Sequence, residues 1–238
     1  MKRAALALLL LCGAAALALD WREVAAVRIP AGEVASVAVD GETVWKRVPY
    51  DAEIEYLEST GTQWIDTGYV PTHETEFNLR FSPNVLTDGS IKPVHGNAYS
   101  TKNYRSADQA PVTLWHSNGT NNRFFYSPVM FSNWAVGETF DVRQGAAGLW
   151  INGSKIGEYS SLRTPPNEPM WLFRYYNGVN EQFGKFKLFY WKAWQNGTLV
   201  RDFTPVRVGL TGYLYDRVSG QLYGNAGTGA FVLGPDKE

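Results

Sequence analysis

The chain has 238 residues, with 22 basic and 23 acidic side chains and a formal net charge of −1. These charges are spread along the chain without a basic patch or a charged tail, which argues against nucleic acid or a charged surface as the partner. Aromatic residues make up 14% of the chain and are accompanied by 23 Gly and 12 Pro. This composition is typical of many short strands joined by tight turns.

The first residues have the organisation of a secretory signal peptide. A short positive start precedes the unbroken apolar run Ala4–Leu11, and Ala16-Leu17-Ala18 fits the small-x-small cleavage pattern. The apolar core is shorter than the ~20 residues that a membrane-spanning helix needs. Cleavage after Ala18 would also remove Cys12, the single cysteine. We therefore expect a secreted or cell-surface protein without disulfides and not an integral membrane protein, a pattern that favours a bacterial or phage-derived product.

Residues 19–50 form a separate segment that contains one predicted hairpin. Val34–Val39 alternates apolar and small residues, Asp40-Gly41 supplies a two-residue turn, and Glu42–Trp45 returns. Asp-Gly favours such turns because both turn residues need a positive φ. A single hairpin is marginally stable in water, so we expect it to dock on the main domain or on a partner. The predicted organisation is thus a signal peptide (1–18), a hairpin with a linker (19–50) and a main domain (51–238).

The main domain shows no helical periodicity, and its predicted elements are short strands bounded by Gly, Pro, Asn or Asp. Strands at this spacing without intervening helices predict a sandwich or a barrel. In chain order they are Glu53–Leu57, Trp64–Asp66, Glu74–Phe81, Thr113–His116, Arg123–Tyr126, Thr139–Gln144, Gly148–Asn152, Lys155–Tyr159, Pro169–Arg174, Lys185–Gln195, Leu199–Val206, Gly212–Asp216 and Gln221–Gly224.

Three Asn-Gly pairs mark predicted hairpin turns: Asn118-Gly119, Asn152-Gly153 and Asn196-Gly197. Each is followed by Ser or Thr and is formally a glycosylation acceptor. The turn explains them better, because Asn-Gly favours a tight turn without any glycan.

The strand that ends at Trp194 is apolar on both faces. Strict alternation predicts that Phe189 shares a face with Trp191, and that Leu188, Tyr190 and Trp194 share the other. One face then belongs to the core, and the other is covered or forms a binding surface. The lysines Lys185, Lys187 and Lys192 are interpreted as charges that protect a sheet edge.

The closing stretch predicts a turn that joins two edge strands. Asp216 precedes Arg217-Val218-Ser219-Gly220, and the glycine ends the predicted turn. Arg201 or Arg207 is close enough in the strand pattern to pair with Asp216 across the sheet.

Four segments together resemble the LamG-like (concanavalin A-like lectin/glucanase) modules of bacterial surface and phage tail proteins. They are EIEYLESTGTQWIDTG (53–68), LWINGSKIGEY (149–159), WLFRYYNG (171–178) and FKLFYWKAWQNGTLVRDFTPVRVGLTGYLYDRVSGQLYGNAGTGAF (186–231). The resemblance implies a two-sheet antiparallel jelly-roll sandwich beside the small N-terminal hairpin. It also implies a non-catalytic module that recognises carbohydrate or another cell-surface ligand.

The strongest catalytic candidate is the acidic run at 53–58, because laminarinase-type glycosidases that share this fold carry Glu-x-Asp-x-x-Glu on a strand. Glu53 and Glu55 share a face, whereas Glu58 has the opposite parity and the middle position is Glu rather than Asp. We therefore expect no catalytic residues. Two alternatives stay open: a glycoside hydrolase of the laminarinase type, and a structural or adhesion domain that binds protein in a surface assembly.

Sugar recognition combines aromatic stacking with hydrogen bonds from polar side chains in a cleft. Two regions, 95–126 and 174–177, have that chemistry. Adjacent tyrosines on a strand point to opposite faces, so one of Tyr175 and Tyr176 is expected to face solvent and stack on a sugar. The predicted ligand-binding residues are Tyr104, Trp115, Arg174, Tyr175, Tyr176 and Asn177. Trp115 has a core position as its alternative.

No cofactor is required by the sequence. Calcium is the metal to consider, because lectin-type sandwiches often hold it at one rim. Oxygen ligands suit that ion, and the candidate ligands are Asp88, Asn103 and Asp108.

Overall fold

The computed structural model describes residues 28–29, 32–33, 36–39, 42–84, 91–97, 113–117, 123–126, 129–132, 135, 137–158, 168–176 and 181–238. Among these residues, side chains are not described for residue 176, for those within 28–46 apart from Val37, or for those within 91–132 apart from Pro93 and Val94. The chain divides into two compact units, Met1–Pro49 and Tyr50–Glu238. Each unit is described by itself.

The first unit contains the predicted hairpin. Its strands are β1 (Arg28–Ile29), β2 (Gly32–Glu33), β3 (Ser36–Val39) and β4 (Glu42–Lys46). β3 and β4 pair antiparallel with Val39 opposite Glu42, which confirms the hairpin around residues 40 and 41. β1 and β2 form a second, shorter antiparallel pair.

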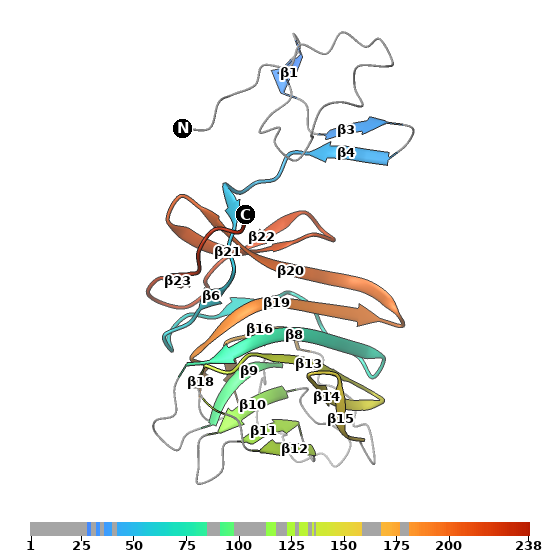
Figure 1. Cartoon of the computed structure of the whole chain (residues 1–238), viewed down its shortest axis with the longest axis vertical. Helices are drawn as coiled ribbons and strands as arrows, with labels where there is room; N and C mark the ends of the chain where they lie inside the picture. Colours follow the sequence, from blue (N-terminus) through green and yellow to red (C-terminus); the bar gives the residue numbers. More distant parts are fainter. Residues whose placement is uncertain are drawn as a thin grey trace. The chain divides into compact units, whose positions relative to one another are not determined.

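The second unit is built on a large antiparallel sheet of eleven strands. These are β5 (Ala52–Glu53), β6 (Leu57–Glu58), β8 (Thr75–Pro83), β13 (Phe140–Gly145), β14 (Gly148–Ile151), β15 (Ser154–Gly157), β19 (Phe186–Gln195), β20 (Thr198–Val208), β21 (Thr211–Asp216), β22 (Gln221–Tyr223) and β23 (Val232–Leu233). The main path runs β15-β14-β13-β8-β19-β20-β21-β22, while β5, β6 and β23 lie off it. Figure 1 shows β13, β8, β19 and β20 side by side.

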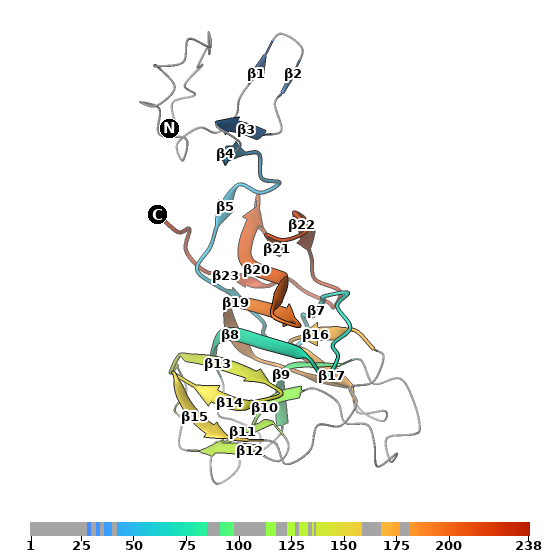
Figure 2. The ribbon, with the colours of Figure 1, turned by 90° about the vertical axis from the view of Figure 1, so that its right-hand side faces the viewer.

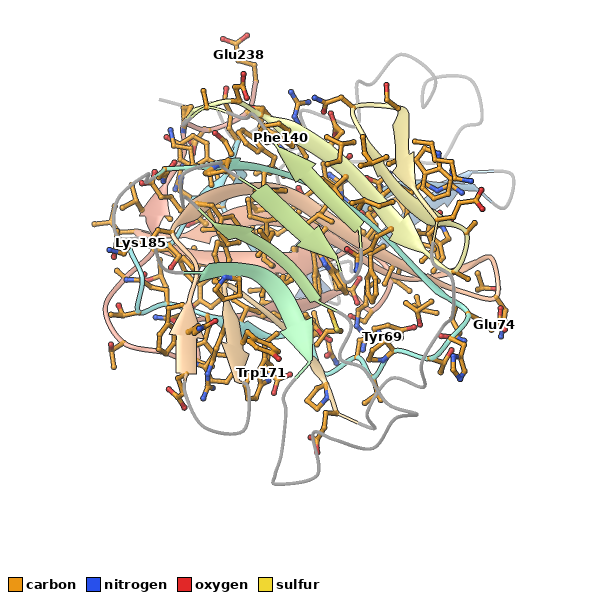
Figure 3. The ribbon with its side chains drawn as sticks, turned by 90° about the horizontal axis from the view of Figure 1, so that it is seen from below. Tyr69, Glu74, Phe140, Trp171, Lys185 and Glu238 are labelled. Atoms are coloured by element: carbon orange, nitrogen blue, oxygen red, sulfur yellow. The ribbon has the colours of Figure 1, made fainter. Side chains whose placement is uncertain are left out.

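A smaller sheet of six strands covers one face of the large sheet. Its strands are β7 (Ile65–Asp66), β9 (Ile91–Asn97), β10 (Thr113–Ser117), β11 (Arg123–Tyr126), β12 (Val129–Ser132) and β16 (Met170–Leu172). Their order is β12-β11-β10-β9-β16-β7. A further antiparallel ribbon joins β17 (Arg174–Tyr176) to β18 (Glu181–Phe183). Figures 2 and 3 show the green strands of the smaller sheet as a second layer.

The core lies between the two sheets and follows from the period-2 alternation of the strands. In β8, Phe77, Leu79 and Phe81 are buried, while the residues between them face outward. Leu172 from the smaller sheet joins the same apolar cluster, as does Trp191 of β19. The prediction of an all-β antiparallel sandwich is confirmed. The described residues include no helix that is long and apolar enough to cross a membrane.

The Asn-Gly pairs that are described form the expected turns. Asn152 and Gly153 have φ values of 49° and 80°, and Asn196 and Gly197 have 50° and 76°. Both pairs join antiparallel neighbours, β14 to β15 and β19 to β20. Positive φ at both turn positions is what a type I′ hairpin requires. Asn118-Gly119 lies outside the described residues.

The glycine-rich loop at 225–229 fastens the end of the domain to its beginning. Asn225 Oδ1 accepts the N–H of Trp64 at 3.2 Å and that of Gly227 at 2.8 Å. The Thr62 hydroxyl donates to the carbonyl of Thr228 at 2.8 Å. The first and last segments of the family resemblance are therefore in direct contact.

Candidate binding groove

The outward-facing side chains of the large sheet line up across neighbouring strands. The register pairs Trp150 with Arg143, Arg143 with Asn78, Asn78 with Lys192, and Lys192 with Asp202. Arg217 extends the row, because its N–H donates to the carbonyl of Asp202 at 2.9 Å. Polar and aromatic groups from segments far apart in sequence thus meet on one face.

A groove of about 490 Å³ opens on this face at β8, β19 and β20. We call it the outer-face groove. Its lining combines aromatic, amide, hydroxyl and charged side chains, which come from these three strands and from the residues after β21 and β23. They are Asn78, Phe189, Tyr190, Lys192, Trp194, Asp202, Phe203, Thr204, Arg217 and Lys237.

β19 supplies the aromatic side of the groove. A register shift between Leu188 and Tyr190 marks a β-bulge. Leu188 before the bulge and Trp191 after it are both buried and so lie on the same face. The predicted assignment of these two residues to opposite faces is therefore wrong. The bulge inserts an extra residue and resets the alternation, which sends Tyr190 and Trp194 to the outer face. Lys192 lies between them in the sheet interior, paired to both β8 and β20. Lys187 is likewise paired to both β6 and β8, so neither lysine protects an edge.

Tyr190 is held in place by an acidic and an amide neighbour. Its hydroxyl lies 2.7 Å from Asp141 Oδ1 and 3.0 Å from Asn78 Oδ1. Burial raises the pKa of Tyr190 above its usual value, and the hydrogen bond to Asp141 and the charge of that carboxylate raise it further. The phenol therefore stays neutral and donates its proton to Asp141.

The polar side of the groove begins with an ion pair. Lys192 Nζ lies 3.1 Å from Asp202 Oδ1, and the Asp202 side chain is largely buried. The Asp202 N–H donates to Asp216 Oδ1 at 2.9 Å. Both contacts fix the orientation of Asp202 in the groove wall.

Glu53 holds the two cations at the far end of the groove. Arg217 Nη2 donates to Glu53 Oε1 at 2.8 Å and to Oε2 at 2.9 Å, and Lys237 Nζ lies 3.7 Å from Oε2. Burial by itself would raise the pKa of Glu53, but the hydrogen bond and charge of Arg217, with Lys237 and the hydroxyl of Tyr50, bring it below the ordinary value. A general acid needs the opposite shift, so Glu53 is suited to positioning Arg217.

The acidic run around Glu53 does not form the single predicted strand. Glu53 belongs to β5 and pairs with β20, whereas Glu58 belongs to β6 and pairs with β19. Between them Ile54 forms an isolated bridge to Asp236. The segment changes partner strand because the last residues of the chain fill the gap, and the acids therefore face different neighbours.

The known proteins that resemble this chain do so in structure. No protein-family model matches it, and no curated protein matches it in sequence. A candidate carbohydrate-binding protein from Bacteroides ovatus matches with 10% identity and a TM-score of 0.50, over 84% of this chain and 66% of that one. A sialidase from Trypanosoma rangeli matches with 11% identity and a TM-score of 0.35, over 76% of this chain and 34% of that one.

The first likeness shows the fold alone. It relates the chain to a β-rich structure of which the chain spans slightly less than two thirds. The second is too distant to support any argument.

Of the ligand-binding residues predicted from sequence, Arg174 is enclosed by tryptophans. Its Cζ lies 4.2 Å from the ring centroid of Trp64 and 4.1 Å from that of Trp171, and its guanidinium pairs with Glu181. We call this cluster the arginine–tryptophan clamp; Figure 3 shows Trp171 close to β17 and β18. The Arg174 side chain is only 13% exposed, so the clamp is first of all a packing element.

The backbone conformation of Phe173 explains why Trp171 and Arg174 can come into contact. It has a φ of 65°, although it is bulky and fully buried. This left-handed residue interrupts the alternation between β16 and β17. Trp171 and Arg174, which have opposite parity in an unbroken strand, consequently lie on the same side.

Tyr175 points into the protein and is 1% exposed. Its ring therefore offers no surface for stacking in this structure, and Tyr176 stays the predicted stacking residue of the pair. Side chains of Tyr176 and Trp115, and the whole of Tyr104 and Asn177, lie outside the described residues.

The predicted calcium ligands also lie outside the described residues. These are Asp88, Asn103 and Asp108. Among the side chains that are described, no group of three His, Cys, Asp or Glu is placed to hold a metal. Calcium binding stays a prediction.

Sequence reasoning missed most of the outer-face groove. The one usable signal was the doubly apolar strand at 186–194, which indicated that its second face is covered or binds. Asn78, Asp202 and Arg217 carry no local signal, because only the strand register brings them together.

Proposed function

We propose that the chain is a non-catalytic carbohydrate-binding module and that the outer-face groove holds the sugar. The observation that carries this proposal is the division of the groove into an aromatic and a polar side. Tyr190 and Trp194 offer apolar ring surface from β19, while Asn78 and Asp202 flank Lys192 on the two neighbouring strands. The C–H faces of a sugar ring suit the first side, and its hydroxyl groups suit the second.

The family resemblance and the fold likeness support the same function. The closing stretch 186–231 resembles LamG-like modules, and we propose that the second unit is such a module. The Bacteroides ovatus protein with a similar fold is described as a candidate carbohydrate-binding protein. Export also belongs to the proposal, and it rests on the signal-peptide pattern of residues 1–18.

The geometry around Glu53 favours binding over hydrolysis. A glycosidase needs one carboxyl group with a raised pKa as its acid and a second as base or nucleophile. The pKa of Glu53 is lowered, and Asp202, the carboxylate that lines the groove, is paired with Lys192. Glu53 is therefore not prepared for the acid role, and Asp202 is engaged in an ion pair.

A glycan array followed by calorimetry tests the proposal. We expect Trp194→Ala to abolish binding of the selected glycan. Trp150→Ala is the matched control, because Trp150 lies on the same face but outside the groove. Tyr176→Ala tests the other candidate site, and loss of binding in that variant alone would move the site to residues 174–177.

Two results would overturn the proposal. Absence of binding to any glycan, together with self-association in light scattering, would favour a structural or adhesion domain. Hydrolysis of laminarin that is lost in Glu53→Gln would make the chain a glycosidase.

A further inference from the structure

We infer that the outer-face groove recognises an acidic glycan, whose carboxylate or sulfate group docks against Arg217, Lys237 and Lys192. This inference rests on the proposed function and names its ligand class. The first argument is charge: among the described lining residues three are cations, and Asp202 is the one that carries a carboxylate. Glu53 lies behind Arg217, so the cluster keeps an excess of one positive charge.

The cations have many hydrogen-bond donors to spare. Arg217 uses Nη2 alone to bind both oxygens of Glu53, and its Nε and Nη1 have no hydrogen bond within the described part of the chain. Lys237 Nζ, at 3.7 Å from Glu53, is beyond hydrogen-bond distance. The side chains of Arg217 and Lys237 are 46% and 38% exposed, so these donors reach solvent.

The carboxylate that lines the groove is already engaged, because Asp202 Oδ1 pairs with Lys192 at 3.1 Å. A neutral sugar hydroxyl both donates and accepts, but a carboxylate or sulfate only accepts. A groove with surplus donors and an engaged carboxylate therefore complements an acceptor-rich, negatively charged ligand.

The spacing of the groups suits a sugar that carries such a charge. Lys192 lies two residues from Tyr190 and two from Trp194 on one face of β19, which places it about 7 Å from each along the strand. Arg217 flanks Asp202 on its other side. A sugar ring stacked on either aromatic side chain thus has its substituents within reach of a cation.

Glu53 has a supporting role in this arrangement. It fixes Arg217 through both carboxylate oxygens and draws Lys237 to the same end of the groove. It is a positioning residue, because it contacts the cations and does not line the groove.

Paired polymers test the inference by calorimetry on the whole protein. One pair is polygalacturonate and its carboxyl-reduced form, the other is dextran sulfate and dextran, and polyglutamate is the polyanion without sugar. We expect the protein to bind the charged member of at least one pair. Its affinity for the neutral counterpart should be lower by about tenfold or more. The two pairs distinguish carboxylate from sulfate.

Charge variants locate the docking site. Lys237→Gln and Lys192→Gln should each lower the affinity for the acidic polymer about tenfold. Arg143→Gln removes the same charge from the same face outside the groove and should change the affinity little. Near-UV circular dichroism checks that each variant is folded.

The outcomes separate this inference from the proposed function. Equal affinity for charged and neutral polymers, still lost in Trp194→Ala, would overturn the acidic preference and leave carbohydrate binding standing. Tight binding of polyglutamate would also overturn it. So would a loss of affinity in Arg143→Gln that equals the loss in Lys237→Gln and Lys192→Gln. If no polymer binds and the glycan array is empty, the proposed function falls and the inference falls with it.

Discussion

Glu53 and Arg217 are 164 positions apart in sequence, yet Arg217 Nη2 donates to both carboxylate oxygens of Glu53, at 2.8 Å and 2.9 Å. Lys237 lies near the same carboxylate. The contact ties the first strand of the domain to the turn after β21, and it sets the geometry of one end of the outer-face groove.

We predict that Glu53→Gln makes stability less sensitive to acid. The pKa of Glu53 is lowered from its ordinary 4.5 in the folded protein, so its stabilising contribution is present above that value and is lost as the pH falls through the folded-state pKa. The variant should lose about 1 kcal/mol at pH 7 and approach the parent at low pH. Urea unfolding at several pH values measures this. Glu55→Gln, at an exposed position, is the control, and parallel pH profiles for Glu53→Gln and the parent would contradict the prediction.

Asp216 is fully buried and organises the turn between β21 and β22. Its carboxylate accepts the N–H groups of Asp202 and Val218 and the hydroxyl of Ser219, and it lies 3.8 Å from Arg201 Nε. Of the two arginines that the strand pattern allowed, Arg201 is thus the partner of Asp216, while Arg207 pairs with Asp236.

Asp216→Ala should therefore be among the most damaging single changes. It leaves two N–H groups and a cation without their acceptor, at a cost of about 3 kcal/mol or more in unfolding free energy. Asp216→Asn keeps an acceptor oxygen and should cost clearly less. Urea unfolding measures the free energy of both variants. Equal losses of unfolding free energy would show that the shape of the side chain, rather than its hydrogen bonds, accounts for the stabilisation.

The arginine–tryptophan clamp is expected to stabilise the junction of β16 and β17. Arg174→Gln removes the cation from between Trp64 and Trp171 and should lower the unfolding free energy by about 2 kcal/mol, with a change in near-UV circular dichroism. Arg143→Gln is the exposed comparison, because Arg143 lies 4.8 Å from the ring centroid of Trp150 and pairs with Glu76. It should cost about 0.5 kcal/mol. A larger loss of unfolding free energy in Arg143→Gln than in Arg174→Gln would contradict the prediction that enclosure between the two tryptophans makes Arg174 stabilising.

Gly227 is required by close approach. A Cβ placed there would lie 2.0 Å from the carbonyl oxygen of Thr62 and 2.8 Å from Cδ1 of Trp64. Gly227→Ala should therefore destabilise by roughly 3 kcal/mol, because the loop must move off residues 62–64. Gly153 has a φ of 80° and open space around it, so Gly153→Ala should cost only about 1 kcal/mol. Thermal unfolding of the two variants compares the effects, and similar losses would argue against tight packing at Gly227.

Local signals in the sequence were sufficient for the fold class and for the turns. Asn152-Gly153 and Asn196-Gly197 adopt the positive φ values that this dipeptide favours. The strand predicted at Glu74–Phe81 is present as β8, Thr75–Pro83, and its side chains alternate because that period is a property of the extended backbone. These features depend on neighbours along the chain.

Only the tertiary structure decided what the strands present to a ligand. The bulge before Tyr190 and the left-handed Phe173 each reset the alternation. Neither position has a glycine, the residue from which such an irregularity could have been predicted. A shift of one residue exchanges the faces of a strand, so the outer-face groove and the clamp were hidden from the local pattern. Asn78, Asp202 and Arg217 meet through long-range register, which is fixed by packing of the whole sheet and which no short segment encodes.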